Sequence, residues 1–308
     1  MSKKILITGG TGFIGYHLSR KCLSLGWSVT SLSSRKPHRN KKIKGVKYLK
    51  IDITNKKKLS KIKKDFDYIV NLAGYVDHSN KKKTLESHYL GCKNLASIFE
   101  TEKIKKFIQI GSSVEYGKLK SPHIENKNCS QSTFSVYGKA KLSSTKFLLD
   151  LSKKKKFPST IIRLYLVYGP KQDINRVIPI TIKNALLDKI FDCSKGLQYR
   201  DFIFIDDVIN AILKILKNNK TNGEIINIGS NRPIKIRDLI NKICFIVGSG
   251  KPVFGKIKMR KDETMALYPN IDKAKKLLNW RPKISLNAGL KKTIQYYKNE
   301  KSISNFKR

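Results

Sequence analysis

The sequence predicts an α/β fold of the Rossmann type, a doubly wound parallel sheet with helices on both faces and a smaller, partly interleaved C-terminal α/β domain. Three observations predict this class. Short β-branched runs alternate with amphipathic segments of helical length through the first half of the chain. A glycine-rich turn follows the first of these runs, and the alternation changes after Gly169-Pro170.

Six short apolar runs predict the strands of this sheet, and most of them are separated by segments of helical periodicity. Such alternation is typical of parallel strands joined by helical crossovers. The six runs are Ile5–Thr8, Ser28–Leu32, Tyr48–Ile51, Tyr68–Leu72, Phe107–Ile110 and Thr160–Leu164.

The second part of the chain predicts one strand and helix around residues 202–217 and an amphipathic helix after Pro282. We therefore expect a main domain over residues 1–170 and a smaller domain over residues 171–300, which closes over the carboxyl edge of the sheet. The remaining residues, 301–308, are expected to form a frayed tail.

The composition fits a globular protein that needs neither a disulfide nor a bound metal to fold. The chain has 308 residues, 40% of them apolar, so it can bury a large core without a disulfide or a metal. Its five cysteines are scattered and form no C-x-x-C pair, which favours a reducing compartment and argues against a zinc site. No apolar run suits a signal peptide or approaches the roughly 18 residues of a membrane helix. We expect a cytoplasmic protein with neither a metal nor a membrane partner.

The formal net charge of +43 raises the question of a nucleic-acid partner. The lysines, however, are spread along the chain in short runs such as 56–58, 81–83 and 153–156, interleaved with asparagine and isoleucine. A nucleic-acid interface would more typically gather arginines and aromatic residues into one stripe. This distribution favours a solvated surface and no nucleic-acid partner, although the positive field would attract an anionic nucleotide substrate.

The glycine-rich turn has the sequence Thr8-Gly9-Gly10-Thr11-Gly12-Phe13-Ile14-Gly15 and lies between the first predicted strand and an amphipathic helix. Glycines permit a tight turn, close approach of a pyrophosphate to the backbone, and close packing of helix on strand. The helix N-terminus adds amide donors and a favourable dipole. The turn therefore predicts a dinucleotide cofactor, held by Gly9, Thr11, Gly12, Phe13, Ile14 and Gly15.

Further motifs follow in a specific order. Asp52-Ile53 follows the third strand, Asn71-Leu72-Ala73-Gly74 the fourth and Ser112 the fifth; after these come Tyr137-x-x-x-Lys141, Arg163 to Pro170 and Arg200 to Val208. From residue 4 to about residue 293, this order resembles the extended short-chain dehydrogenase/reductases, the nucleotide-sugar epimerase/dehydratase group.

The resemblance implies roles for several of these residues. Asp52 and Ile53 would flank the adenine, and Asn71 to Gly74, including Leu72 and Ala73, would line the cofactor cleft. It also implies a nucleotide-diphosphate sugar as substrate and a homodimer packed through helices at residues 84–102 and 137–151.

Tyr137 and Lys141 are four residues apart, so on a helix both project from one face. A free phenol has a pKa of about 10 and is a poor acid or base near neutral pH, but a neighbouring ammonium lowers that pKa. Tyr137 would then exchange a proton with a sugar oxygen while hydride moves to or from the nicotinamide. Ser112 would hydrogen-bond the same oxygen, and Lys141 would also bind the nicotinamide ribose.

Four substrate contacts are expected. By resemblance, Arg200 and Arg260 align with arginines that grip the nucleotide diphosphate, a task that suits the fixed fork of a guanidinium. Arg176 lies in the segment that faces the nucleotide in this family, and Ser113 stands beside the catalytic serine.

Three departures from the family pattern narrow the reaction. Dehydratases carry an acid pair directly after the catalytic hydroxyl, whereas this chain has Ser113 and Val114 there and its acid, Glu115, displaced by one position. An acid displaced in this way would point away from the substrate, which argues against a 4,6-dehydratase. NAD-preferring members carry an acid after the second strand, where Ser33-Ser34-Arg35 instead suits the 2′-phosphate of NADP. The segment 254–265 resembles that of synthases of the CDP-abequose and CDP-paratose type, which reduce a 4-keto deoxysugar.

These features predict a 4-ketoreductase that uses NADP in preference to NAD and acts on a nucleotide-diphosphate deoxysugar. One alternative is a nucleotide-sugar 4-epimerase with tightly bound NAD, and another is a scaffold that kept the fold and cofactor but lost catalysis. Two histidines stay open. His88 stands where an asparagine is frequent, and is either a packed helix residue or part of the active-site water network; His78 either faces the substrate or has no role in the site.

Overall fold

The β-branched runs form seven parallel strands in the computed structural model, which describes residues 2–77, 79–125, 135–259 and 263–299. Within these residues the strand order is β11-β6-β5-β4-β1-β2-β3, and every pairing is parallel. The strands are β1 (Lys4–Thr8), β2 (Ser28–Ser33), β3 (Lys47–Lys50), β4 (Tyr68–Asn71), β5 (Lys106–Ser112), β6 (Ser159–Leu164) and β11 (Glu224–Ile228). The predicted doubly wound parallel sheet is confirmed.

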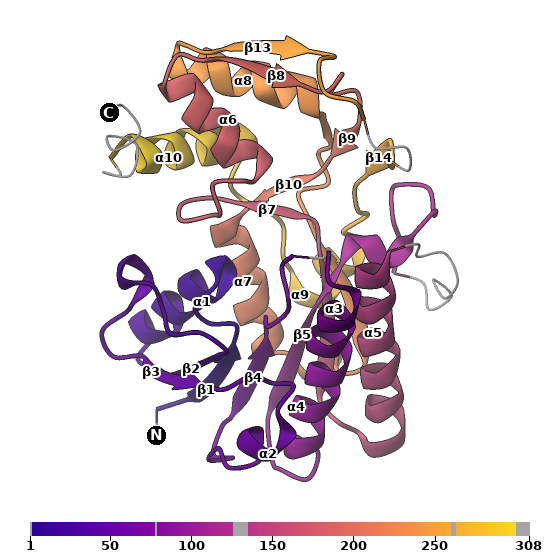
Figure 1. Cartoon of the computed structure of the whole chain (residues 1–308). Coiled ribbons are helices and arrows are strands. Elements are labelled where there is room, and N and C mark those ends of the chain that lie inside the picture. The colour runs from indigo at the N-terminus through magenta and orange to yellow at the C-terminus, as the bar shows by residue number, and fades with distance from the viewer. Residues whose placement is uncertain (1, 78, 126–134, 260–262, 300–308) are drawn as a thin grey trace.

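The sheet separates two hydrophobic cores. Ile5 and Ile7 of β1 belong to one core and Leu6 to the other, because successive side chains of a strand point to opposite faces. Helices α1 (Phe13–Ser24) and α7 (Ile205–Leu216) cover the first face. Helices α2 (Lys56–Leu59), α4 (Gly91–Phe99) and α5 (Val136–Lys155) cover the second face, and α3 (Lys81–Leu85) lies above α4 and beside the upper part of α5 (Figure 1).

A second lobe lies beyond the carboxyl edge of the sheet (Figure 1). Its helices are α6 (Val177–Leu186), α8 (Ile236–Val247) and α10 (Leu286–Asn299). Its short strands pair as β7 (Leu166–Tyr168) with β10 (Phe202–Phe204), β8 (Ile190–Cys193) with β13 (Lys251–Phe254), and β9 (Tyr199–Arg200) with β12 (Ile234–Lys235) and β14 (Ala266–Leu267). Shorter turns of helix are η1 (Arg39–Lys41), η2 (Glu86–Leu90), η3 (Ser113–Tyr116), η4 (Asn219–Thr221) and α9 (Asp272–Leu278).

The C-terminal part of the chain contributes to both lobes. The strand and helix expected at residues 202–217 are present as β10 and α7, and the helix expected after Pro282 is α10. The seventh strand of the sheet, β11, was not predicted; it pairs with β6 along its whole length.

The strand order reverses at β1, which has β2 on one side and β4 on the other. In an open α/β sheet, ligands bind outside the carboxyl ends of the strands at such a switch point, because the loops there diverge and leave a crevice. The glycine-rich turn follows β1, and the segment Leu72–Gly74 follows β4. Both therefore stand at the switch point.

Candidate active site

The glycine-rich turn packs so closely that two of its positions exclude a side chain. Gly9 has φ +65°, and a Cβ there would lie 2.8 Å from the carbonyl carbon of Leu72. A Cβ on Gly15 would lie 2.5 Å from both the Cα of Gly10 and the carbonyl oxygen of Gly9. The backbone therefore requires glycine at 9 and 15. Gly12 is exposed, and its N–H donates to the Gly9 carbonyl at 2.9 Å, which closes the turn.

Helix α1 begins directly behind this turn without a side-chain cap. Its N-cap residue is Gly12, and its first turn contains no acidic residue. The first amides of a helix, here those of Phe13 and Ile14, have no carbonyl partner within the helix, and the helix dipole places positive charge there. Thr11 N–H donates to Ser33 Oγ at 3.4 Å, which ties the turn to the end of β2. This cradle fits the pyrophosphate of a dinucleotide.

A buried polar chain fixes the strand ends beneath the cradle. The Thr8 hydroxyl donates to Asn71 Oδ1 at 2.5 Å, and Asn71 Nδ2 donates to Gln109 Oε1 at 2.7 Å. These three residues lie on the neighbouring strands β1, β4 and β5. Ala73 N–H approaches both Thr8 Oγ1 (3.4 Å) and Asn71 Oδ1 (3.3 Å), so the same chain positions the Leu72–Gly74 segment.

The three predicted catalytic residues converge on the end of β5. Ser112 is the last residue of that strand, and Tyr137 and Lys141 lie on the first turns of α5. Lys141 is 5% exposed, and its Nζ donates to the Ile110 carbonyl of β5 at 2.6 Å. The same ammonium lies 5.8 Å from the centre of the Tyr137 ring. The helical spacing therefore places the phenol and the ammonium beside the strand that carries Ser112.

Glu115 is fully buried, and its hydrogen bonds fix Ser112 relative to helix α5 and strand β6. Its Oε1 accepts the Ser112 N–H at 2.7 Å, and its Oε2 accepts the Thr145 hydroxyl of α5 at 2.7 Å. Arg163 of β6 donates to Oε2 through Nε (3.1 Å) and Nη2 (3.0 Å). One carboxylate thus joins β5, β6 and α5. This acid faces the protein interior.

The residues expected around the adenosine lie near the ends of β2 and β3. Ser34 and Arg35 are exposed, directly after β2. Asp52 is exposed, and its Oδ1 accepts both the N–H (2.9 Å) and the hydroxyl (2.8 Å) of Thr54, which forms a local turn. Ile53 is a core residue at 4% exposure.

The expected substrate residues are more scattered. Ser113 is buried in η3, and Arg176 is exposed at the N-terminus of α6. Arg200 of β9 is largely buried, donates to the Tyr199 carbonyl at 2.8 Å, and forms an ion pair with Glu263. Burial lowers the pKa of Arg200, and Glu263 opposes that shift. Arg260 and His78 lie outside the described residues.

Sequence reasoning missed Asp201 as an anchor of the second lobe. This carboxylate is fully buried and accepts the Ser230 N–H (2.7 Å), the Ser230 hydroxyl (2.8 Å) and the Arg232 N–H (3.1 Å). Burial raises the pKa of Asp201, and these hydrogen bonds oppose the shift. The signal in the sequence was its place in the motif Arg200 to Val208, directly before the apolar run Phe202–Phe204.

His88 lies against Tyr137, the tyrosine that the sequence predicts to be catalytic. It is 5% exposed, and the centres of its ring and the Tyr137 ring are 4.9 Å apart in an edge-to-face arrangement. The structure therefore places this histidine, whose role the sequence left open, in direct contact with the site.

The sequence pattern of the NAD dependent epimerase/dehydratase family matches residues 5–229, a span that includes the glycine turn and all three catalytic candidates. The chain belongs to this family. As a member, it is an NAD(P)-dependent enzyme of the extended short-chain dehydrogenase/reductase group, and the predicted resemblance is confirmed.

Known proteins resemble this family member along nearly its whole length. CDP-abequose synthase of Salmonella muenchen is 27% identical over 96% of this chain and 98% of its own. A UDP-glucose 4-epimerase of Thermotoga maritima, solved with UDP-glucose, is 25% identical with a TM-score of 0.88, covering 96% of this chain and 98% of its own. A UDP-glucuronic acid 4-epimerase of Bacillus cereus, solved with UDP-glucuronic acid and NAD, is 30% identical with a TM-score of 0.86, covering 96% and 99%.

Two further findings concern the described part of this enzyme. None of the helices there is both long and apolar enough to span a membrane. Across the same residues, no three histidine, cysteine, aspartate or glutamate side chains are grouped so that they could hold a metal ion.

Proposed function

We propose that this enzyme is an NADP(H)-dependent 4-ketoreductase of a nucleotide-diphosphate deoxysugar. The observation that carries the proposal is the placement of Ser112, Tyr137 and Lys141 at one strand end, with the Lys141 ammonium 2.6 Å from the Ile110 carbonyl of β5. The glycine cradle at the end of β1 would hold the pyrophosphate of the cofactor, two strands away in the same sheet. Similarity to CDP-abequose synthase supports a nucleotide-linked deoxysugar as the substrate class.

The bound nicotinamide would supply or accept the hydride. The Tyr137 hydroxyl would donate a proton to the C4 oxygen of the sugar as the ketone is reduced, and would accept it in the reverse direction. Ser112 Oγ would hydrogen-bond the same oxygen and orient the carbonyl. The Lys141 ammonium would stabilise the negative charge that develops on Tyr137 as the proton leaves.

Exposed groups after β2 support NADP as the preferred cofactor. Ser34 and Arg35 offer a hydroxyl and a guanidinium where an acid would otherwise bind the ribose 2′-hydroxyl. Replacing Arg35 with alanine should raise the Kd for NADPH about tenfold, or roughly 1.4 kcal/mol, and leave the Kd for NADH unchanged. Fluorescence titration measures both constants, and Lys44→Ala in the same β2–β3 connection is the matched control. Equal effects on both cofactors would contradict NADP selectivity.

A 4-epimerase with tightly held NAD is the second candidate. It is supported by the two solved 4-epimerases, of which the Bacillus cereus enzyme was solved with NAD. The two reactions differ in their cofactor balance. An epimerase returns the hydride to the same sugar and would carry NAD through gel filtration, whereas a reductase consumes one NADPH for each sugar reduced.

The test is a turnover panel with UDP-glucose for epimerisation and a CDP-linked 4-keto-6-deoxyhexose with NADPH for reduction. Tyr137→Phe should lower turnover at least about 100-fold, because it removes the proton donor. Tyr297→Phe is the control: it deletes one hydroxyl on α10, which donates to the Gln172 carbonyl at 2.7 Å, and should stay within about twofold. Full turnover by Tyr137→Phe would overturn the mechanism. Cofactor binding without turnover of any panel sugar would instead favour the scaffold.

A further inference from the structure

His88 sits in a widened turn of helix rather than in a regular α-helix. Residues Glu86–Leu90 form the π-helical turn η2 between α3 and α4, and the Gly91 N–H at its end bonds back to the Glu86 carbonyl, five residues earlier. Such turns are rare and occur frequently at functional sites. The widened turn aims the His88 side chain toward α5 while the chain continues into α4.

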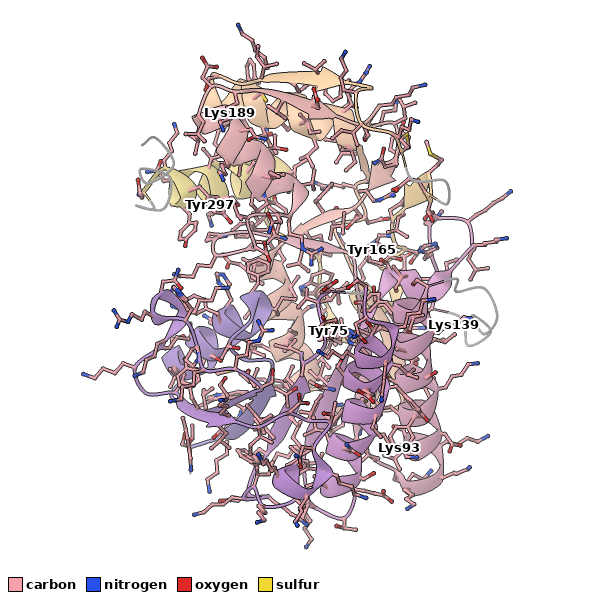
Figure 2. The ribbon with its side chains drawn as sticks, viewed as in Figure 1. Tyr75, Lys93, Lys139, Tyr165, Lys189 and Tyr297 are labelled. Carbon is pink, nitrogen blue, oxygen red and sulfur yellow. The ribbon has the colours of Figure 1, made fainter. Side chains whose placement is uncertain are left out.

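Two adjacent residues of this turn grip the backbone of Tyr75 from both sides. The Tyr75 N–H donates to Ser87 Oγ at 2.9 Å, and the Tyr75 carbonyl lies 3.1 Å from His88 Nε2. Because a carbonyl only accepts, His88 Nε2 carries a proton and donates it. Figure 2 labels Tyr75 in the upper part of the lower lobe. The turn therefore fixes the loop that continues from the cofactor segment Leu72–Gly74.

The His88 ring also occupies the place that a side chain on residue 74 would need. A Cβ on Gly74 would collide with the imidazole carbon Cε1 of His88. The same imidazole packs edge to face with Tyr137, with 4.9 Å between the ring centres. The His88 carbonyl accepts the Ser144 hydroxyl of α5 at 2.7 Å, so a second contact joins this turn to the helix that carries Tyr137.

We infer that His88 is a positioning residue, a wedge between Gly74 and Tyr137 that sets the phenol against the cofactor-facing loop. The imidazole contacts the loop at Gly74 and through its hydrogen bond to the Tyr75 carbonyl, and it packs edge to face with the Tyr137 ring. A ring held from one side can rotate away from the reacting oxygen, and a displacement of about 1 Å can cost 100-fold in rate. The inference rests on the proposed role of Tyr137.

The test compares His88→Ala, His88→Phe and Tyr137→Phe with the unmodified enzyme, using the two panel probes, UDP-glucose and the CDP-linked 4-keto-6-deoxyhexose. Alanine removes the wedge and should lower kcat about 10- to 100-fold, with KM and cofactor affinity changing less than about threefold. Phenylalanine restores an aromatic edge of similar size and should recover most of kcat. Because His88 acts through Tyr137, His88→Ala should cost nothing further when Tyr137 is already phenylalanine.

A control variant separates positioning from loss of stability. The control is Ile98→Ala. Ile98 lies on α4, is 7% exposed and packs in the core on the same face of the sheet as α5. This variant should lower the melting temperature and leave kcat within about twofold.

Three results would overturn the inference: an unchanged kcat in folded His88→Ala, a His88→Phe variant as slow as the alanine variant, or additive losses in the double variant. If His88→Ala has an unchanged kcat while Tyr137→Phe is inactive, the positioning role of His88 is refuted and the proposed function stands. Full activity of Tyr137→Phe would instead refute the proposed function.

Discussion

The carboxylate of Glu115 offers the most decisive test of how the active site is held. Glu115 and Arg163 are 0% and 1% exposed, and the carboxylate accepts hydrogen bonds from the Ser112 backbone, the Thr145 hydroxyl and two nitrogens of Arg163. Glu115→Gln keeps the volume of the side chain but removes its charge. It also replaces one acceptor oxygen with an amide that donates, and this amide must face groups that also donate.

The expected cost follows from burial. Removing one partner of a buried ion pair destabilises a protein by about 3 to 5 kcal/mol, because the other charge is left in a poorly solvated place. A typical native state is stable by only about 5 to 15 kcal/mol, so the loss is a large fraction of the whole. At roughly 2 °C per kcal/mol for a large domain, the melting temperature should fall by about 6 to 10 °C.

Circular dichroism during thermal and urea unfolding measures this loss. A double-mutant cycle with Arg163→Met isolates the pair, and the double variant Glu115→Leu with Arg163→Met should be less destabilised than the sum of its single changes. Lys275→Gln, which breaks the exposed pair with Asp272, is the control and should cost less than about 1 kcal/mol. A loss below about 1 kcal/mol in Glu115→Gln would refute the view that this carboxylate joins β5, β6 and α5.

Three more outcomes are expected. Gly12→Ala should be as stable as the unmodified enzyme, since φ at Gly12 is −77° and a Cβ would meet only the Gly9 carbonyl oxygen at 3.2 Å. The same variant should bind the dinucleotide about tenfold more weakly. Gly15→Ala should instead lose about 1 to 3 kcal/mol of stability. Melting curves and cofactor titrations distinguish the two variants, and equal behaviour would contradict the cradle. His123 has a pKa lowered by burial, so the free energy of unfolding should fall by up to about 1.4 kcal/mol per pH unit as the pH drops below 6.5; His123→Gln should lose this dependence. If two chains pack as a homodimer through the helices at 84–102 and 137–151, light scattering should give twice the mass of one chain. Leu90 is 41% exposed in this structure, and Leu90→Glu would place a charge in that interface, so this variant should be monomeric. A monomeric unmodified enzyme would contradict the dimer.

The sequence predicted those features that depend on local periodicity and chain order. Six strands of the sheet stood out because β-branched runs alternate with helical segments, and Tyr137 and Lys141 stood out because their spacing places them on one helix face. The seventh strand, Glu224–Ile228, did not, since it lies beyond the alternating first half of the chain and its pairing with β6 is a long-range contact.

Contacts between distant segments were beyond what the sequence could show. The π-helical turn at Glu86–Leu90 was not predicted from the sequence, and the packing of His88 against Gly74 depends on a loop from another strand. The position of Glu115 suggested that it faces away from the substrate, but not that Arg163 would be its partner. The ion pair of Arg200 with Glu263 joins residues 63 positions apart in the chain.

The late position of β11 has a consequence for biosynthesis. All six residues of β6 are buried, and β11 covers that edge with Ile225, Ile226 and Ile228. During translation, however, β6 ends at Leu164 and β11 ends 64 residues later at Ile228. At the usual rate of synthesis this gap lasts roughly 3 to 13 seconds, during which an apolar strand edge has no partner from its own chain. A nascent chain halted between these strands would present that edge to other chains, which makes this interval of synthesis a period of exposure to aggregation and to chaperone binding.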